Sequence, residues 1–301
     1  MILNQERQGE LFIFAETIFW SLFPVITILS YNKLSPLVSL AASTFFATIF
    51  FAIVVTIQKK WHEIKNKSAL GDILLATFFI GILLYLLYFF GLRYTSAGNA
   101  SIIGLTEIFF SYVFFHIWRK EYIPKQHLVG AFLMITGALV ILYPSFQKFR
   151  GGELLILTAA FVAPFGNFFQ QRARKIVSSQ SMMFIRSLIT TLVIFLLIFI
   201  FKTTFSYSDL KSSFIFIIIN GVFLLGFSKI LWIEGIHRIS VTKANALSSI
   251  TPLLTLLFAW LFLQNIPTIW QLFSVVPMFF GVILLGMEGK TIFFDKRRIP
   301  S

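Results

Sequence analysis

The chain contains no cysteine, and charged residues make up only 12% of its 301 positions. The missing cysteine excludes disulfides, thiolate metal sites and a cysteine nucleophile, although it identifies no cellular compartment. Soluble domains carry roughly 25% charged residues. With 57% hydrophobic residues and 39 phenylalanines, the chain has more apolar surface than one soluble core can bury. Lipid must therefore be the solvent for most of that surface.

Recognisable catalytic motifs are missing as well. The sequence has no Gly-x-Ser-x-Gly, no His-Glu-x-x-His, no Walker A loop and no paired carboxylates at metal-binding spacing. The four histidines fall in expected loops or at the ends of apolar runs, which favours interface residues over a metal site. We therefore predict a protein without enzymatic activity, cofactor or metal centre.

The charge balance is strongly basic, with a formal net charge of +13. In a soluble protein such a balance would suggest nucleic-acid binding. Here lysine and arginine sit mainly in short segments between apolar runs, where they set orientation and meet anionic lipid headgroups. No basic face has a globular scaffold beneath it. The predicted partner is a lipid bilayer and not a nucleic acid.

Ten apolar runs are long enough to cross that bilayer. A spanning helix needs about 20 mainly apolar residues. Such runs lie near 11–30, 36–57, 70–91, 97–117, 126–144, 153–171, 181–201, 213–235, 244–263 and 268–287. Their connections are short, so no soluble domain fits between them. The predicted fold class is an all-α membrane protein with ten transmembrane helices.

The basic residues also predict the orientation of the chain. Most of the 25 lysines and arginines fall in segments on the same side as the N-terminus, including the polar stretch 58–68 and the C-terminal tail. Positively charged loops stay in the cytoplasm. We therefore expect both termini to be cytoplasmic and the chain to lie in a plasma membrane, the inner membrane of a bacterium.

The sequence repeats itself at a nearly constant offset of 143 or 144 residues. Several short matches carry the repeat, namely Gly9-Glu10-Leu11 with Gly152-Glu153-Leu154, Gly91-Leu92-Arg93-Tyr94 with Gly235-Ile236-His237-Arg238, Ile123-Pro124 with Ile266-Pro267, and Gly137 with Gly281. Chance could give one such match, but not a steady offset across several.

Each half holds five expected spans, which is an odd number, so the second half must enter the membrane from the opposite side. We predict two inverted five-helix repeats over residues 1–147 and 148–289, followed by a basic cytoplasmic tail, 290–301. Inverted repeats are a common construction in secondary transporters, whose substrate site lies near the midplane between the halves.

Over residues 9–287 the chain resembles the EamA-type family of the drug/metabolite transporter superfamily. In that family a motif similar to Gly-Leu-x-Tyr-Thr-Ser-Ala precedes the fourth span, as residues 91–97 do here. Residues 235–244 match the motif more loosely in the second half, and Pro252 keeps the mid-span proline. The resemblance implies export or exchange of small metabolites such as amino acids.

Two further positions carry the resemblance. Family members often show Glu-Pro or Ser-Pro in the fourth span, and here Glu107 keeps the acidic residue while Ile108 replaces the proline. An arginine is common in the second span of each repeat. Arg186 fits this position in the second half, and Ser43 stands at the matching place in the first.

Ionisable groups inside a bilayer cost about 2.5–3.5 kcal/mol and usually face a cavity or a partner. Glu107 lies near the midplane, and we predict a cargo-binding or protonatable carboxylate; the alternative is a protonated Glu that ties two helices together. Glu16, Arg186 and Lys229 share the inner third of the membrane. We expect Glu16 to pair with Arg186 or Lys229, unless the long Lys229 stem carries its charge to the interface.

Aromatic and amide residues complete the candidate site. Trp20 follows Glu16 at spacing i, i+4 on one helix face, and we expect it to form a cavity wall. Tyr85 corresponds by the repeat offset to Lys229. Asn167 belongs to a polar cluster with Gln170 and Gln171 that either lines a path or marks where the helix leaves lipid. Tyr88 and Trp232, near span ends, are expected in an interfacial belt.

The predicted function is a secondary transporter that moves a small-molecule cargo by alternating access, as an exporter or exchanger. Proton coupling through Glu107 or Glu16 and facilitated diffusion both stay open. The alternatives are a membrane-embedded lipid-handling protein and a non-transport subunit of a membrane complex. A homodimer also stays open.

Overall fold

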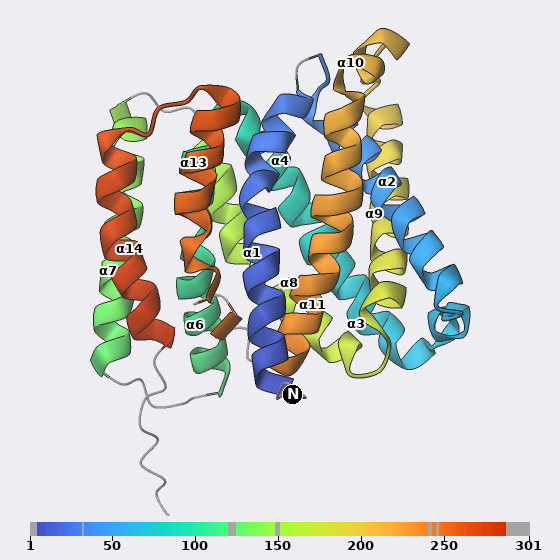
Figure 1. The fold of residues 1–301 in the computed structure, drawn as a ribbon, viewed down its shortest axis with the longest axis horizontal. Helices are drawn as coiled ribbons and strands as arrows, with labels where there is room; N and C mark the ends of the chain where they lie inside the picture. Colours follow the sequence, from blue (N-terminus) through green and yellow to red (C-terminus); the bar gives the residue numbers. More distant parts are fainter. Residues whose placement is uncertain are drawn as a thin grey trace, which may run out of the picture.

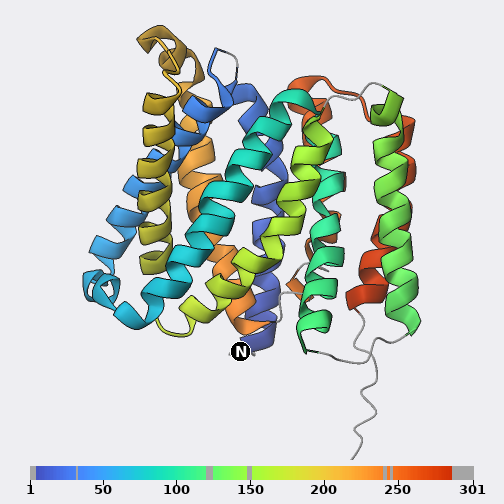
Figure 2. The ribbon, with the colours of Figure 1, turned by 180° about the vertical axis from the view of Figure 1, so that it is seen from behind.

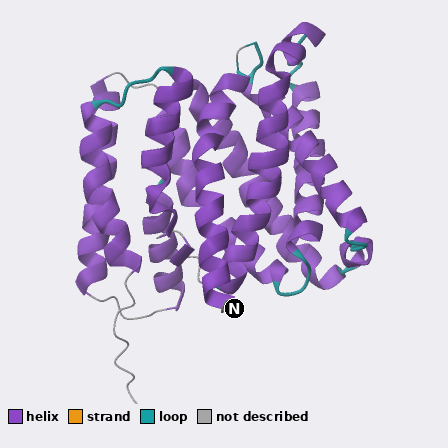
Figure 3. Cartoon of the chain, viewed as in Figure 1, coloured by secondary structure: helices purple, strands orange, loops and turns teal. Residues whose placement is uncertain are grey.

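The computed structural model describes residues 5–31, 33–119, 125–147, 151–239, 243–244 and 247–286. These ranges consist of helices joined by short loops and contain no strand. Figures 1 and 3 show the helices standing side by side in one bundle, and Figure 2 shows it from behind. The expected basic tail, 290–301, and the repeat landmark Ile123-Pro124 lie outside the described residues.

The bundle has the composition of a membrane protein. Within the described ranges, eight helices are long and apolar enough to cross a membrane, and two shorter apolar helices accompany them. Large apolar side chains stay exposed on the outward faces, for example Phe199 at 81%. Water would penalise such a surface, whereas lipid solvates it. The chain is therefore a multi-pass helical membrane protein.

The first half begins with two long helices and ends with a third. Its elements are α1 (Gln5–Ser30), α2 (Pro36–Ile57), the 3-10 turn η1 (Trp61–Lys65), α3 (Lys67–Ala76), η2 (Thr77–Leu84), α4 (Tyr85–Tyr94), α5 (Ala97–Gly104), α6 (Thr106–Arg119) and α7 (Lys125–Gln147). Ser35 caps α2 ahead of Pro36, and Ser96 caps α5 by accepting a hydrogen bond from the backbone N–H of Asn99.

The elements of the second half follow a similar order, except that the described residues contain no counterpart of η1. They are α8 (Gly152–Arg174), α9 (Ser179–Ile200), α10 (Tyr207–Ile218), η3 (Ile219–Phe227), α11 (Ser228–Arg238), the 3-10 turn η4 (Ser248–Ile250), α13 (Thr251–Leu263) and α14 (Ile269–Gly286). Ser178 caps α9, and Ser206 forms a reciprocal capping box with Asp209 at the start of α10.

Both halves interrupt regular α-helix at equivalent places. η2 and η3 are π-helical and lie inside the expected third and eighth spans. The expected fourth span turns at Leu105 between α5 and α6, and α13 follows the turn η4 in the expected ninth span. Such interruptions expose backbone and redirect side chains, and π segments are frequent at functional sites.

Helices of the two halves pack in exchanged pairs, in which a helix of one half contacts a helix of the other and the repeat-related pair does the same in reverse. α1 packs on α11 and α4 packs on α8, while α2 packs on α9 and α7 on α14. Glycines allow the close approach in the first two pairs. A Cβ atom at Gly9 would lie 3.4 Å from the carbonyl oxygen of Gly235, and one at Gly91 would lie 3.1 Å from that of Gly152. α1 and α8 run in opposite directions along the bundle (Figures 1 and 2).

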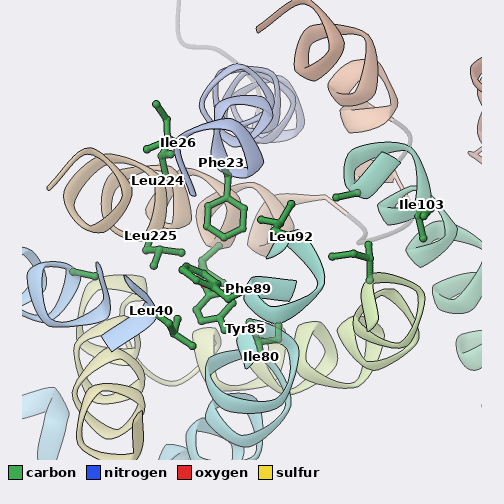
Figure 4. Packing of buried hydrophobic residues seen from close by; sticks show 14 of the residues in the cluster. Phe23, Ile26, Leu40, Ile80, Tyr85, Phe89, Leu92, Ile103, Leu224 and Leu225 are labelled. Atoms are coloured by element: carbon green, nitrogen blue, oxygen red, sulfur yellow. The ribbon is translucent and has the colours of Figure 1, made fainter. Parts of the chain in front are cut away.

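Aromatic side chains fill the centre where α1 meets α4. Phe23 and Phe89 point toward each other in Figure 4, with ring centroids 5.8 Å apart, and Tyr85 lies beside them. Leu224 and Leu225 of η3 close the same cluster. This packing fixes the depth and rotation of the helices that carry the cavity described below.

Candidate functional site

A cavity of about 140 Å³ lies between the two halves. Its wall combines apolar side chains with a small number of polar and charged ones, as ligand sites do. All seven residues singled out from the sequence line this cavity: Glu16, Trp20, Tyr85, Glu107, Asn167, Arg186 and Lys229. They come from α1, α4, α6, α8, α9 and α11.

Glu16 and Lys229 neutralise each other inside the wall. The Lys229 Nζ atom lies 2.8 Å from Glu16 Oε1, and the two residues are 8% and 2% exposed. The same Nζ lies 3.2 Å from the centroid of the Trp20 ring, a favourable cation–π position. Lys229 therefore does not extend to the interface, and it is Lys229, not Arg186, that pairs with Glu16.

Arg186 has neutral neighbours. Its guanidinium donates hydrogen bonds to Gln170 Oε1 and to the Tyr85 hydroxyl, the latter at 3.0 Å. It also lies 5.7 Å from the centroid of the Tyr85 ring. The residue is 3% exposed, and no described carboxylate lies within ion-pair distance of it. Arg186 is thus a buried cation whose charge the described residues leave uncompensated.

Glu107 is an acidic residue in the same cavity as the Arg186 cation. The residue lies in the first turn of α6, just after the turn at Leu105, and its side chain lines the cavity. Glu107 Oε1 accepts a hydrogen bond of 2.8 Å from the Asn167 amide. Within the described ranges, no lysine or arginine forms an ion pair with it. The carboxyl group therefore has one amide donor and no ion-pair partner among the described residues.

Two amides of α8 connect these unpaired charges. Gln170 accepts from Arg186 and donates to Asn167 Oδ1 at 3.0 Å, and Asn167 in turn donates to Glu107. Asn167 Oδ1 also accepts from Trp232 Nε1 at 3.2 Å. The chain of hydrogen bonds holds a cation and an anion at separate places on one wall. A ligand with both charges could contact each of them.

Sequence reasoning misplaced two aromatic residues. Tyr88 and Trp232 line the cavity and do not belong to an interfacial belt. The reason is that α4 continues to Tyr94 and α11 to Arg238, so both rings lie deeper than the expected span ends indicated. Of the polar cluster, Asn167 and Gln170 face the cavity, whereas Gln171 donates to the Ile236 carbonyl and ties α8 to α11.

Sequence reasoning also gave no cavity role to Ser101, Ser248 or Thr251, which all line the wall. The repeat offset was a usable signal for Thr251, because it lies 144 positions after Glu107. The two halves thus present equivalent positions to one cavity.

Comparison with known proteins gives a consistent result. The model of the EamA-like transporter family matches the chain twice, over residues 7–143 and 150–287. An uncharacterized transporter of Bacillus subtilis, YoaV, is 22% identical over 95% of this chain and 98% of its own length. An uncharacterized transporter of Methanothermobacter thermautotrophicus is 23% identical over 94% of this chain and 87% of its own.

A solved crystal structure shares the fold. It superposes with a TM-score of 0.73 at 16% sequence identity, covering 93% of this chain and 97% of the other. At that identity the likeness concerns the arrangement of helices and not the cargo.

Proposed function

The chain belongs to the EamA-like transporter family, and from this we propose that it is a secondary transporter for a small zwitterionic metabolite such as an amino acid. It would act as an exporter or exchanger in the plasma membrane. The observation that carries the proposal is the pair of unneutralised charges, Arg186 and Glu107, in one buried cavity.

A buried charge without an ionic partner is costly to maintain. The chain nevertheless keeps one of each sign, while the neighbouring Glu16 and Lys229 satisfy each other. A bound zwitterion would offset the free-energy cost of burying both charges, because its carboxylate would pair with Arg186 and its ammonium with Glu107. We assign Trp20, Tyr85 and Asn167 to the walls and amide contacts of the same site, and Glu16 with Lys229 to its fixed charge pair.

We further propose that ten spans form two inverted repeats, 1–147 and 148–289, which rock about the cavity to expose it alternately. The two family matches, the exchanged helix pairs and the opposed directions of α1 and α8 support this arrangement. The start of α1 and the end of α14 lie at one end of the bundle (Figure 1), which supports termini on one side. The basic segments favour the cytoplasm of a bacterium for that side.

The lipid bilayer and the cargo are the proposed partners, with no nucleic acid and no catalytic reaction. A homodimer stays a prediction.

The test is uptake into proteoliposomes that contain the purified protein. Radiolabelled amino acids are compared with matched amines and carboxylic acids, with and without a pH gradient. We expect zwitterions to be taken up and to exchange with unlabelled cargo. Glu107→Gln should lower zwitterion uptake at least about tenfold, because it removes a hydrogen-bonded charge, whereas Asp209→Asn, outside the cavity, should not.

Two results would contradict this proposal. Uptake of amines alone, unchanged by Glu107→Gln, would mean that the two charges do not hold cargo. Transfer of labelled phospholipid between leaflets, with no uptake of any solute, would instead favour a lipid-handling protein.

A further inference from the structure

Two carboxylates near the starts of α1 and α8 lie outside the cavity. Glu10 and Glu153 occupy equivalent positions in the repeat, each between a glycine and a leucine. Neither lines the cavity wall. Both form contacts that cross from one half of the chain to the other, at opposite ends of the bundle (Figures 1 and 2).

At the end that holds the N-terminus, the contact is ionic. Lys243 Nζ lies 2.6 Å from Glu10 Oε1 and also pairs with Glu6. The side chains of Glu10 and Lys243 are each about one third exposed, so solvent screens the pair. We call Glu10 with Lys243 the near latch.

At the opposite end, the equivalent carboxylate meets neutral groups. Glu153 is 5% exposed and accepts hydrogen bonds from the Thr95 hydroxyl at 2.7 Å and the Asn99 amide at 3.4 Å. Its second oxygen is buried and accepts no hydrogen bond from any residue that the structure describes. Gln271 of α14 braces this contact by donating to Asn99 Oδ1 at 2.7 Å. We call Glu153 with Thr95 and Asn99 the far latch.

The two latches are equivalent in the repeat. Glu153 lies 143 positions after Glu10, and Lys243 lies 144 positions after Asn99. Each latch therefore joins the first helix of one half to the beginning of the interrupted span of the other. In the far latch, Asn99 belongs to α5, whose later residues Ser101 and Gly104 line the cavity. One short helix therefore connects the far latch to the cavity wall.

We propose that the near and far latches are the two gates of the transport cycle, and that opening one end of the cavity requires its own latch to break. The inference rests on the proposed transport function and adds which contacts control access from each side. The near gate is an exposed ion pair, whereas the far gate is a buried carboxylate held by neutral donors. The two gates should therefore respond to different substitutions.

The absence of cysteine makes a direct test possible. Ala163→Cys places a single reporter in the cavity wall. Its labelling by a membrane-impermeant maleimide is measured in right-side-out and inside-out vesicles, with an N-terminal tag to define the near side. Each latch variant is then combined with this reporter, and Ser101→Cys serves as a second reporter on another helix.

We expect each variant to act on one side only. Glu10→Ala should raise labelling from the near side about threefold, the size expected for a partly exposed ion pair. Exchanging the charges in Glu10→Lys with Lys243→Glu should restore the rate of Glu6→Gln alone when both changes are made in that Glu6→Gln background, because Glu6 would otherwise repel the new carboxylate. Glu153→Ala should raise labelling from the far side about tenfold, because hydrogen bonds to a buried charge are stronger.

Asn99→Lys is the sharpest variant, because it copies the near latch at the far end. It should lower far-side labelling severalfold and slow transport, and adding Glu153→Gln should reverse both effects. Any variant that aggregates on gel filtration is replaced by Glu10→Gln or Glu153→Gln, which keep the side-chain size.

The proposal is overturned if both alanine variants change labelling from the same side, or if neither changes it with either reporter. If the parent protein takes up no cargo but the latch variants still change labelling from one side only, the proposed transport function is contradicted. The assignment of the two latches as side-specific gates is then still supported.

Discussion

The two halves of the molecule present equivalent positions to the cavity but supply opposite charges. The first half contributes both carboxylates, Glu16 and Glu107, and the second contributes both cations, Arg186 and Lys229. Seven pairs of cavity-lining positions are related by the repeat offset, namely Glu16 with Ala159, Trp20 with Ala163, Pro24 with Asn167, Tyr85 with Lys229, Tyr88 with Trp232, Gly104 with Ser248, and Glu107 with Thr251.

This difference shows that the repeat applies to the backbone positions around the cavity and not to the side chains at those positions. The repeated backbone fixes which positions face the cavity, while each side chain can diverge without moving a helix. Arg186 shows the divergence most clearly, because its counterpart Ser43 has a buried hydroxyl with no hydrogen-bond partner among the described residues. The cavity therefore has repeat-related positions in its wall but opposite charges in its two halves, which suits the proposed cargo with two unlike ends.

The largest effect should follow from breaking the charge pair that joins the halves. Lys229→Met removes the partner of Glu16 and leaves a buried carboxylate uncompensated, which costs about 3–5 kcal/mol. We expect a clear fall in the midpoint of thermal unfolding in detergent. The double variant with Glu16→Gln should recover most of it, and a single variant as stable as the parent would show that the pair is not structural.

The next largest effect concerns the unpaired cation. Arg186→Ser copies the first half into the second and removes the proposed partner of the cargo carboxylate. Zwitterion uptake should fall about tenfold to a hundredfold, the loss expected for hydrogen bonds to a charged group. Uptake of a matched amine should change far less. Equal losses for both cargoes would mean that Arg186 holds the helices together and does not select cargo.

A smaller effect should separate the equivalent aromatic residues. Trp232→Phe removes the indole donor to Asn167, worth about 1 kcal/mol, and should raise the KM for cargo about fivefold with little change in maximal rate. Tyr88→Phe is the matched control, because the Tyr88 hydroxyl forms no hydrogen bond with the described residues. A similar KM for the two variants would exclude a role for the Asn167 contact.

The smallest effect lies outside the membrane, where Glu63 of η1 meets the cap of α9. Burial opposes ionisation there, but hydrogen bonds from the Ser178 hydroxyl and backbone N–H, at 2.5 and 2.8 Å, lower the pKa of Glu63 below its usual value. The contribution to folding is therefore present above the unfolded pKa of about 4.3 and is lost as the pH falls through the folded pKa.

Glu63→Gln should remove this acid-dependent part of the stability. The unfolding midpoint of the parent should decline below about pH 4.3 more steeply than that of the variant. If the unfolding midpoints of parent and variant decline in parallel as the pH falls, the Glu63 contact makes no pH-dependent contribution to stability.

Much of the fold was predictable, because hydrophobic length is a local property. The expected range 36–57 coincides with α2, bounded by a serine cap and a proline that can be recognised in the sequence. The expected range 213–235 fell short of the segment from Tyr207 to Arg238, whose ends carry polar residues while the helix continues. The turn at Leu105 was not predicted, since neither Leu105 nor Ile108 is a helix breaker.

The sequence by itself determined that the chain is a helical membrane protein with a repeat, and its rare charges within apolar runs pointed to residues that line one cavity. Composition, run length and spacing act along the chain and need no knowledge of the packing. Only the tertiary structure decided that Lys229 is the partner of Glu16, and that two amides of α8 lie between Arg186 and Glu107. Those contacts depend on the rotation and depth of helices far apart in sequence, which are set by how their side chains pack.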